Sequence, residues 1–290
     1  MELATELANN ATSATRAGWQ PRLFDPKADE HRHHINGLLT QCSGVQVHDT
    51  IEEQTCEVIR ARAPFRKYTK DELGQEARSI WKSDSPSEYG LWVYFPWSRR
   101  LVHTLPESEY HFLRSNRNCY KITPEEQNQL RSCTIGIVGL SVGKAAAQTL
   151  ALEGIGGGFR LADYDTLSLS NLNRLQGGIQ HVGLNKAVLA ARQLFEINPF
   201  LQIELFEEGI TESNIDTFFD DDCRLDLLIE ECDDLYVKVR LREAARERRI
   251  PVLMETSDRG LLDIERFDME PDRPLFHGVL GSINAADVKG

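Results

Sequence analysis

The sequence predicts an α/β fold in which helices cover both faces of a mostly parallel sheet, preceded by a separate N-terminal α+β region. The main observation is that β-branched runs and helix-favouring runs alternate from residue 134 to residue 267. Upstream, residues 89–104 alternate aromatic and polar side chains, which is typical of a hairpin. A chain of 290 residues is long enough for each region to have its own hydrophobic core.

The first part of the chain divides into two stretches. Residues 1–20 are rich in Ala, Thr and Asn without periodicity, so we expect a flexible N-terminus. Residues 21–120 are expected to form the N-terminal α+β domain, with helices at 50–61 and 70–82. We expect its aromatic hairpin to be domain core rather than a docking surface, and the histidines of the run 31–34 to be solvated rather than metal ligands.

A strand, glycine turn and helix open the second part of the chain. The strand at 134–138 breaks at a turn from Gly139 to Gly143 into an Ala-rich helix, as in a Rossmann-like βαβ unit. Such a turn lets a phosphate approach the backbone N–H groups at the start of the helix. Asp163 ends the second strand, where an acid takes the ribose hydroxyls of a nucleotide. Residues 121–270 are therefore expected to form a nucleotide-binding domain, and 271–290 a C-terminal loop or the start of a further segment.

The remaining elements of this domain are predicted from their periodicity. Helices are expected at 186–195, 214–219 and 236–248, and strands at 202–206, 225–230, 250–254 and 262–267. The basic charges of the helix at 236–248 are expected to form a solvated face. Lys144 follows the glycine turn and either serves a bound phosphate or points to solvent, and we favour solvent.

A series of polar motifs follows the glycine turn in a fixed order. It comprises Asp163 to Arg174, Gly183 to Lys186, Asn198-Pro199 and Glu231 to Leu235. In this order the motifs resemble those of the ThiF/MoeB family, the bacterial relatives of ubiquitin-activating enzymes. Upstream, Leu113 to Arg117 is similar to the family's R-Y-N-R entry segment, and downstream Arg259 to Phe267 resembles its R-x-x-G-x-I-x-V-F strand. The resemblance covers about half of the chain, from Arg114 to Phe267.

The resemblance implies ATP-dependent adenylation of the C-terminal carboxylate of a small ubiquitin-like or sulfur-carrier protein, or of a peptide. The attacking carboxylate is already ionised, so the chemistry needs alignment and charge neutralisation rather than a strong base. By resemblance, Asp163 would bind the ribose and Asp234 would bind Mg²⁺, while Arg117 would contribute to the active site of the neighbouring subunit in a homodimer. The residues expected at the nucleotide and its phosphates are Gly139, Ser141, Gly143, Asp165, Asn171, Arg174 and Lys186.

The chain also departs from the family pattern. The glycine turn is one residue short, and Glu231 and Leu235 replace an aspartate and an asparagine in the family's D-C-T-D-N. The cysteine pairs that bind zinc in many members are absent, and we interpret Cys232 as a small buried filler rather than a nucleophile. Because the C-terminal half of the usual fold does not follow Gly290, we expect the chain to be the front part of a longer protein.

Composition narrows the possible partners. A net charge of −12 and a pI near 5.2 argue against nucleic acid. No run approaches the length of a membrane span and no secretory signal is recognisable, so we expect a cytoplasmic protein without a membrane partner. The six cysteines form no C-x-x-C pair, so neither a disulfide framework nor a zinc site is expected.

Two alternatives remain open at this stage. The glycine turn and Asp163 would also suit an NAD(P)-binding Rossmann oxidoreductase, although that reading leaves Arg174, Lys186 and Asp234 unexplained. The shortened turn would suit a non-catalytic module for nucleotide binding or dimerisation. Taken singly, Arg174 and Lys186 would be ordinary surface charges, and Asp165 or Asp233 would be turn caps.

Overall fold

The computed structural model describes residues 18–42, 44–82, 85–220, 222–256 and 260–288. The flexible end expected at 1–20 falls mainly on residues 1–17, and these, like Arg259, lie outside the described residues. The chain forms two compact units, residues 1–124 and 125–290. Within the described residues, no helix combines the length and the apolar composition needed to cross a membrane.

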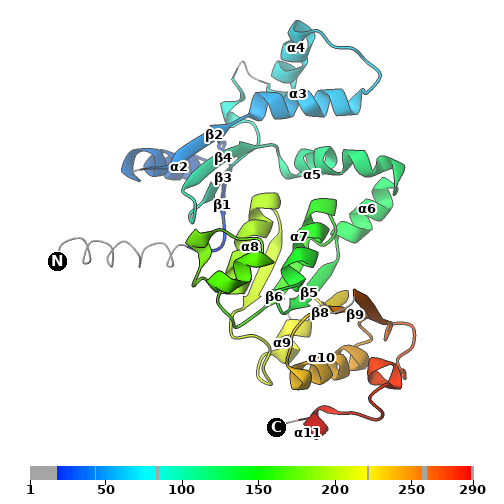
Figure 1. The fold of residues 1–290 in the computed structure, drawn as a ribbon. Coiled ribbons are helices and arrows are strands. Elements are labelled where there is room, and N and C mark those ends of the chain that lie inside the picture. Colours follow the sequence, from blue (N-terminus) through cyan, green and yellow to red (C-terminus); the bar gives the residue numbers. More distant parts are fainter. Residues whose placement is uncertain (1–17, 43, 83–84, 221, 257–259, 289–290) are drawn as a thin grey trace, which may run out of the picture. The chain divides into compact units, whose positions relative to one another are not determined.

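The first unit is built on a four-stranded sheet in the order β1-β3-β4-β2 (Figure 1). Strand β3 pairs antiparallel with β1 and β4, and β2 pairs parallel with β4. The strands are β1 (Arg22–Phe24), β2 (Gln46–Asp49), β3 (Leu91–Phe95) and β4 (Arg100–Thr104). The helices are α2 (Asp29–Gln41), α3 (Ile51–Arg62), α4 (Lys70–Trp81) and α5 (Glu107–Ser115), with 3-10 turns η1 (Pro86–Glu88) and η2 (Asn116–Tyr120). The expected α+β class and hairpin are confirmed.

Sequence patterns missed two helices of this unit. Helix α2 contains the histidine run and has no buried residue, so its apolar periodicity is weak. Its partly buried Ile35 and Leu38 nevertheless pack against the cluster of Phe24, Tyr94 and Leu101. Helix α5 was expected only as a connection, and its Tyr110 and Leu113 pack against a second small cluster. Tertiary packing rather than local pattern explains both helices.

The second unit contains a six-stranded sheet in the order β10-β9-β8-β5-β6-β7. All neighbouring strands are parallel except β10, which runs antiparallel to β9. The strands are β5 (Thr134–Val138), β6 (Gly158–Ala162), β7 (Gln202–Phe206), β8 (Leu227–Glu230), β9 (Val252–Thr256) and β10 (Leu261–Glu265). The predicted Rossmann-like, mostly parallel sheet is confirmed.

Helices cover both faces of this sheet (Figure 1). Helices α7 (Gly143–Glu153) and α8 (Lys186–Ile197) pack together on one face, and α9 (Ile215–Asp220) and α10 (Leu235–Glu247) on the other. The remaining elements are α6 (Pro124–Arg131), η3 (Leu169–Asn173), η4 (Ile179–His181), η5 (Leu275–Gly278) and α11 (Ala285–Val288). One core cluster of this unit includes the fully buried Phe218, Leu228 and Val239.

The strand order reverses at β5. From β5 the chain builds β6 and β7 on one side and β8, β9 and β10 on the other. The loops after β5, β6 and β8 therefore leave the same edge of the sheet in different directions. In open parallel sheets, ligands bind in the crevice that forms at such a reversal.

Candidate functional site

A cavity of about 320 Å³ lies at this reversal, in the second unit. It is lined by the loops that follow β5, β6, β7 and β8 and by the starts of α8 and α10. The site residues predicted from sequence that line it are Gly139, Ser141, Asp163, Asp165, Arg174, Lys186 and Asp234. Gly143 is the first residue of α7 and Asn171 lies on η3, and neither lines the cavity; Arg117 lies on η2 in the other unit.

The glycine turn brings two strand ends into close approach. Gly139 has a φ of 85°, and a Cβ atom there would lie 2.5 Å from the carbonyl oxygen of Glu231. A side chain at Gly143 would meet Ile137 at 2.7 Å. Helix α7 starts at Gly143 without a side-chain cap, so the positive end of its dipole faces the turn.

Asp163 connects the glycine turn to the loop after β6. Its Oδ2 accepts a hydrogen bond from the N–H of Leu140 at 2.7 Å, and its Oδ1 accepts one from the N–H of Asp165 at 2.8 Å. Burial raises the pKa of this carboxyl, against the lowering effect of both hydrogen bonds and of Lys186. Asp163 therefore holds the glycine turn and the loop after β6 together at the cavity wall without a ligand.

Lys186 supplies a nearly buried cation at the first residue of α8. Its side chain is 8% exposed, and its Nζ lies 2.7 Å from Asp165 Oδ2 and 3.3 Å from Ser141 Oγ. The preceding Asn185 caps the helix by accepting from the N–H groups of Ala187 and Val188. The capped helix start thus fixes an ammonium group at the cavity.

Arg174 brings a second cation from the end of η3. Its side chain is exposed, and its Nη1 donates to Asn173 Oδ1 at 3.0 Å. Asn171 Oδ1 accepts from the N–H of Ser168 at 3.0 Å, so this amide stabilises the turn that carries Arg174. The guanidinium of Arg174 keeps more freedom to move than the ammonium of Lys186.

Lys144 does not point to solvent, so that expectation was wrong. Its side chain is 3% exposed, and its Nζ donates to the carbonyl oxygen of Gln176. Burial lowers the pKa of Lys144 to about 8. It does not line the cavity and instead anchors the loop that contains Arg174, a role that needs three-dimensional contacts to be seen.

The loop after β8 brings acidic groups to the opposite wall. Asp234 is the N-cap of α10, and its Oδ1 accepts from the N–H of Val237 at 3.1 Å. Asp233 is exposed and lines the same cavity. Glu231, treated from sequence only as a departure from the family pattern, also lines it and accepts from the N–H of Glu255 at 2.8 Å. Burial raises the pKa of Glu231 to about 7.

The thiol of Cys232 is unsuited to nucleophilic attack in this state. Its Sγ lies 3.0 Å from Glu230 Oε1. Burial, together with the negative charge of Glu230, raises the pKa of Cys232 well above its usual range. The thiol therefore stays protonated at neutral pH, in keeping with its interpretation as a filler.

The cavity combines charged groups of both signs with apolar ones. Arg174, Lys186 and the start of α7 can meet anionic groups of a ligand, and Val138, Ala162, Ile210 and Val237 offer apolar contacts. The lining also contains five carboxylates: Asp163, Asp165, Glu231, Asp233 and Asp234. Among the described residues, no group of three or more His, Cys, Asp or Glu side chains could hold a metal ion. A metal at Asp234 would thus need oxygens from the ligand itself, which is how Mg²⁺ commonly binds with nucleoside phosphates.

Comparisons with known proteins place this site in context. An uncharacterised protein of Mycobacterium tuberculosis is 50% identical over 207 residues, which cover 71% of this chain and 28% of that protein. The tRNA threonylcarbamoyladenosine dehydratase of Bacillus subtilis is 30% identical over 53% of this chain and 60% of its own length. The molybdopterin-synthase adenylyltransferase of Haemophilus influenzae is 28% identical over 57% and 68%.

The chain therefore spans less than two thirds of the first two of these relatives. A sequence profile of the ThiF family matches residues 113–264, which include both walls of the cavity and the strands that position them. The resemblance first suggested by the ordered motifs is confirmed: this chain belongs to the ThiF family.

Proposed function

We propose that this chain is an ATP-dependent adenylyltransferase that activates the C-terminal carboxylate of a small ubiquitin-like or sulfur-carrier protein, or of a peptide. The observation that carries the proposal is the joint presence of Lys186, Arg174 and Asp234 in one cavity beside the glycine turn. The family membership and a relative named as an adenylyltransferase support it further. The cavity volume of about 320 Å³ falls within the range of small-molecule sites.

The side chains suit the charges of this reaction. Lys186, Arg174 and the start of α7 would bind the triphosphate of ATP and offset the charge that develops as pyrophosphate leaves. Asp163 would bind the ribose, as the resemblance implies. Asp234 would hold Mg²⁺, whose chemistry is to bridge and neutralise phosphate oxygens.

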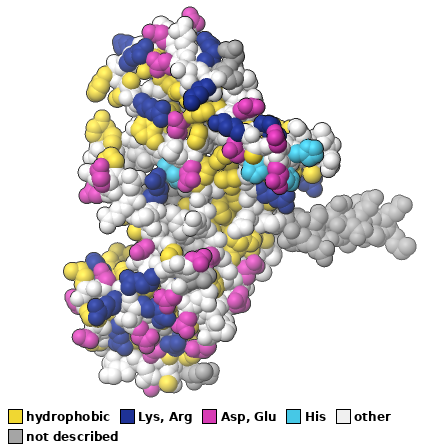
Figure 2. Space-filling view, turned by 180° about the vertical axis from the view of Figure 1, so that it is seen from behind, with side chains coloured by type: hydrophobic (Ala, Val, Ile, Leu, Met, Phe, Trp, Pro, Cys, Tyr) yellow, Lys and Arg dark blue, Asp and Glu magenta, His cyan; other side chains and the backbone are white. Residues whose placement is uncertain are grey.

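The protein acceptor is favoured over a nucleic acid by charge. The net charge is −12, and on the face drawn in Figure 2 acidic and basic side chains are interspersed. Nucleic-acid affinity instead relies on clustered cations. One relative is named for a tRNA modification, so a tRNA-borne carboxylate is the acceptor to be compared in the assay. The proposal includes a homodimer in which Arg117 reaches the neighbouring subunit's site, as the resemblance implies.

The experiment compares ligands first and turnover second. Calorimetric titration with ATP·Mg²⁺ should give saturable binding, and titration with NAD(H) should give none; tight NAD(H) binding would favour the oxidoreductase alternative. Pyrophosphate exchange into ATP should then require a carrier protein that ends in Gly-Gly with a free carboxylate. The same carrier with an amidated C-terminus is the control. ATP binding without exchange under any acceptor, including threonylcarbamoyladenosine-containing tRNA, would favour the non-catalytic module.

A further inference from the structure

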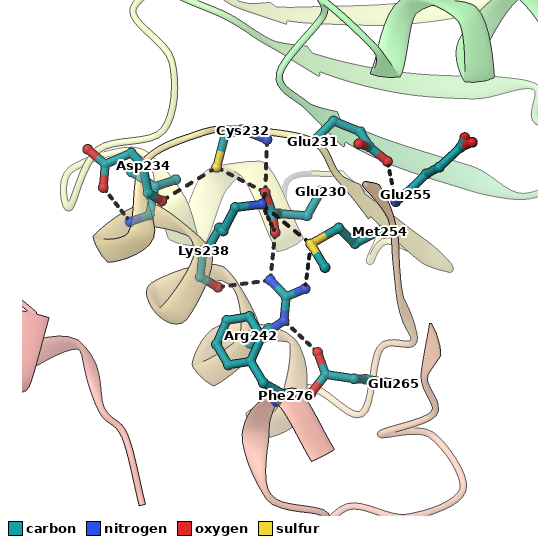
Figure 3. Close-up of polar contacts among 11 residues, drawn as sticks. Glu230, Glu231, Cys232, Asp234, Lys238, Arg242, Met254, Glu255, Glu265 and Phe276 are labelled. Atoms are coloured by element: carbon teal, nitrogen blue, oxygen red, sulfur yellow. Dashed lines mark hydrogen bonds and ion pairs between the residues drawn. The ribbon is translucent and has the colours of Figure 1, made fainter. Parts of the chain in front are cut away.

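A buried network of charged side chains lies beneath the loop that carries Asp233 and Asp234 (Figure 3). Glu230 at the end of β8 and Arg242 on α10 are both fully buried, and Glu265 at the end of β10 is 1% exposed. This corrects the expectation that the basic charges of the helix at 236–248 form a solvated face. The network joins four charges, two of each sign: Glu230, Glu265 and Arg242 are shielded from water, and Lys238 is 20% exposed.

Glu230 connects the loop to α10. Its Oε1 accepts from the N–H of Cys232 at 2.9 Å and lies 2.9 Å from Lys238 Nζ. Its Oε2 accepts from Arg242 Nη1 at 2.6 Å. Every direction in which this carboxylate could accept is therefore taken within the protein, so it cannot act on a ligand directly.

Arg242 continues the network away from the cavity. Its Nε donates to Glu265 Oε2 at 2.5 Å, and its guanidinium lies 4.2 Å from the centre of the Phe276 ring. Glu265 Oε1 accepts in turn from the N–H of Phe276 at 2.7 Å. Removing either carboxylate would leave a buried cation partly uncompensated, so both changes should destabilise the fold.

Only one of the two carboxylates touches the loop. The bond from Cys232 N–H to Glu230 holds the first peptide after Glu231, whose carbonyl oxygen faces Gly139 across the cavity floor. Two residues later, Asp234 starts α10 as its N-cap. The position of Glu230 thus sets both the contact with the glycine turn and the start of the acidic wall.

We propose that Glu230 is a positioning residue for the adenylation site, which fixes the Cys232–Asp234 loop against the glycine turn before ligand binds. The expected effect of Glu230 on turnover rests on the proposed function, whereas its expected effect on the structure of the loop does not. Buried residues that orient metal-binding or reacting groups commonly matter for turnover although they never contact substrate.

The test pairs Glu230→Gln with Glu265→Gln, because the second variant breaks the same network on the side away from the loop. Both should lower the melting temperature. Only Glu230→Gln should lower kcat for pyrophosphate exchange, by about 10-fold or more, and raise the Mg²⁺ concentration needed for half-maximal rate. The KM for ATP should change less than kcat. Equal losses of kcat in the two variants would assign Glu230 a merely structural role and overturn the proposal.

A measurement that does not depend on turnover tests the positioning role of Glu230 separately from the proposed function. Hydrogen–deuterium exchange of residues 231–235 should accelerate in Glu230→Gln and stay at the wild-type rate in Glu265→Gln. If the wild-type chain shows no pyrophosphate exchange, the proposed function fails while this measurement still decides the role of Glu230. Equal rates of hydrogen–deuterium exchange at residues 231–235 in the wild type and in Glu230→Gln would contradict the positioning role.

A second variant of Glu230 keeps the test valid if Glu230→Gln does not fold. Glu230→Asp keeps the negative charge for Arg242 and Lys238 but withdraws the acceptor from the N–H of Cys232 by one methylene. It should fold and still show faster amide exchange at residues 231–235. Wild-type exchange in this variant would likewise overturn the proposal.

Discussion

The two loops that form the cavity walls are fixed in different ways. The loop after β6 is held by helix caps, by a bond from a lysine to a carbonyl and by one ion pair: Asn171 caps η3, Asn185 caps α8, Lys144 anchors the carbonyl of Gln176 and Lys186 pairs with Asp165. The loop after β8 is held from below by a buried network of ion pairs centred on Glu230 and Arg242. The first loop brings Arg174 to the cavity together with Asp163 and Asp165, whereas the charged side chains that the second loop brings are all acidic.

We call the loop after β6 the adaptable wall and the loop after β8 the fixed wall, because their contacts differ in this way. Caps and exposed side chains let Arg174 change position when a ligand arrives, at a small cost in free energy. A buried ion network has few alternative arrangements, because each displaced charge would remain unpaired. We therefore expect changes on the first wall to act on ligand contacts, and changes on the second to act on geometry and stability together.

The largest effect is expected from Lys186→Met, which removes the buried cation of the adaptable wall. Loss of a preorganised donor at the phosphates should lower kcat/KM for ATP by about 1,000-fold. The affinity for ATP should fall as well, because Lys186 contacts the ground state. Pyrophosphate exchange and calorimetry measure the two effects. An affinity close to wild type would show that Lys186 serves only its internal partner Asp165.

Arg174→Ala should act mainly on turnover. The exposed guanidinium is free to follow charge that develops in the reaction, so kcat should fall by about 100-fold while the Kd for ATP changes little. Arg246→Ala, on the last turn of α10 and outside the cavity lining, is the matched control and should retain wild-type rates. Equal losses of binding and of turnover in Arg174→Ala would contradict the assigned role.

Asp234→Asn tests the fixed wall without disturbing its helix. Asparagine caps helices as well as aspartate does, so the fold should persist. Losing one anionic oxygen should raise the Mg²⁺ concentration for half-maximal exchange by about 10-fold. Asp233→Asn is the control from the same cavity. If only the Asp233 variant changes the metal dependence, the magnesium ligand is Asp233 and not Asp234.

Glu231→Gln should change how stability depends on pH. The folded chain keeps a proton on Glu231 up to about pH 7, because burial raises its pKa to about 7, whereas the unfolded carboxyl releases the proton near its ordinary pKa of 4.5. The wild type should therefore lose stability as pH rises between these values, because only the folded state still binds the proton. After allowance for solvent screening, the loss should be about 1 to 2 kcal/mol. Urea unfolding at several pH values should show a flatter profile for the variant, and identical slopes would refute the assignment.

Asn171→Ala should have the smallest effect on the fold. It removes one hydrogen bond, to the N–H of Ser168, from a partly exposed turn, which costs about 1 kcal/mol. Urea unfolding of this variant and of Glu230→Gln at one pH compares the two walls directly. A loss as large as that of Glu230→Gln would remove the distinction between an adaptable and a fixed wall.

Sequence reasoning succeeded where local pattern and order carry the information. The alternation of strands and helices gives the sheet, and the motif order brings Asp163, Arg174, Lys186 and Asp234 to one edge of it. It failed for Lys144 and Arg242, because nothing in the neighbouring residues shows that a cation is buried. Their partners, the carbonyl of Gln176 and the carboxylates of Glu230 and Glu265, are distant in the sequence and are paired only by the fold.

The ion pair between Lys186 and Asp165 means that a phosphate bound at this cavity, as we propose, would replace an existing partner of the ammonium. A ligand can engage the ammonium fully only by drawing it from a carboxylate 2.7 Å away, so the net gain is the difference between two attractions. A singly charged ligand offers about what Asp165 already provides and gains little. A triphosphate offers several oxygens at once, so with the proposed function the resting pair would act as a threshold that favours highly charged nucleotides over monoanions.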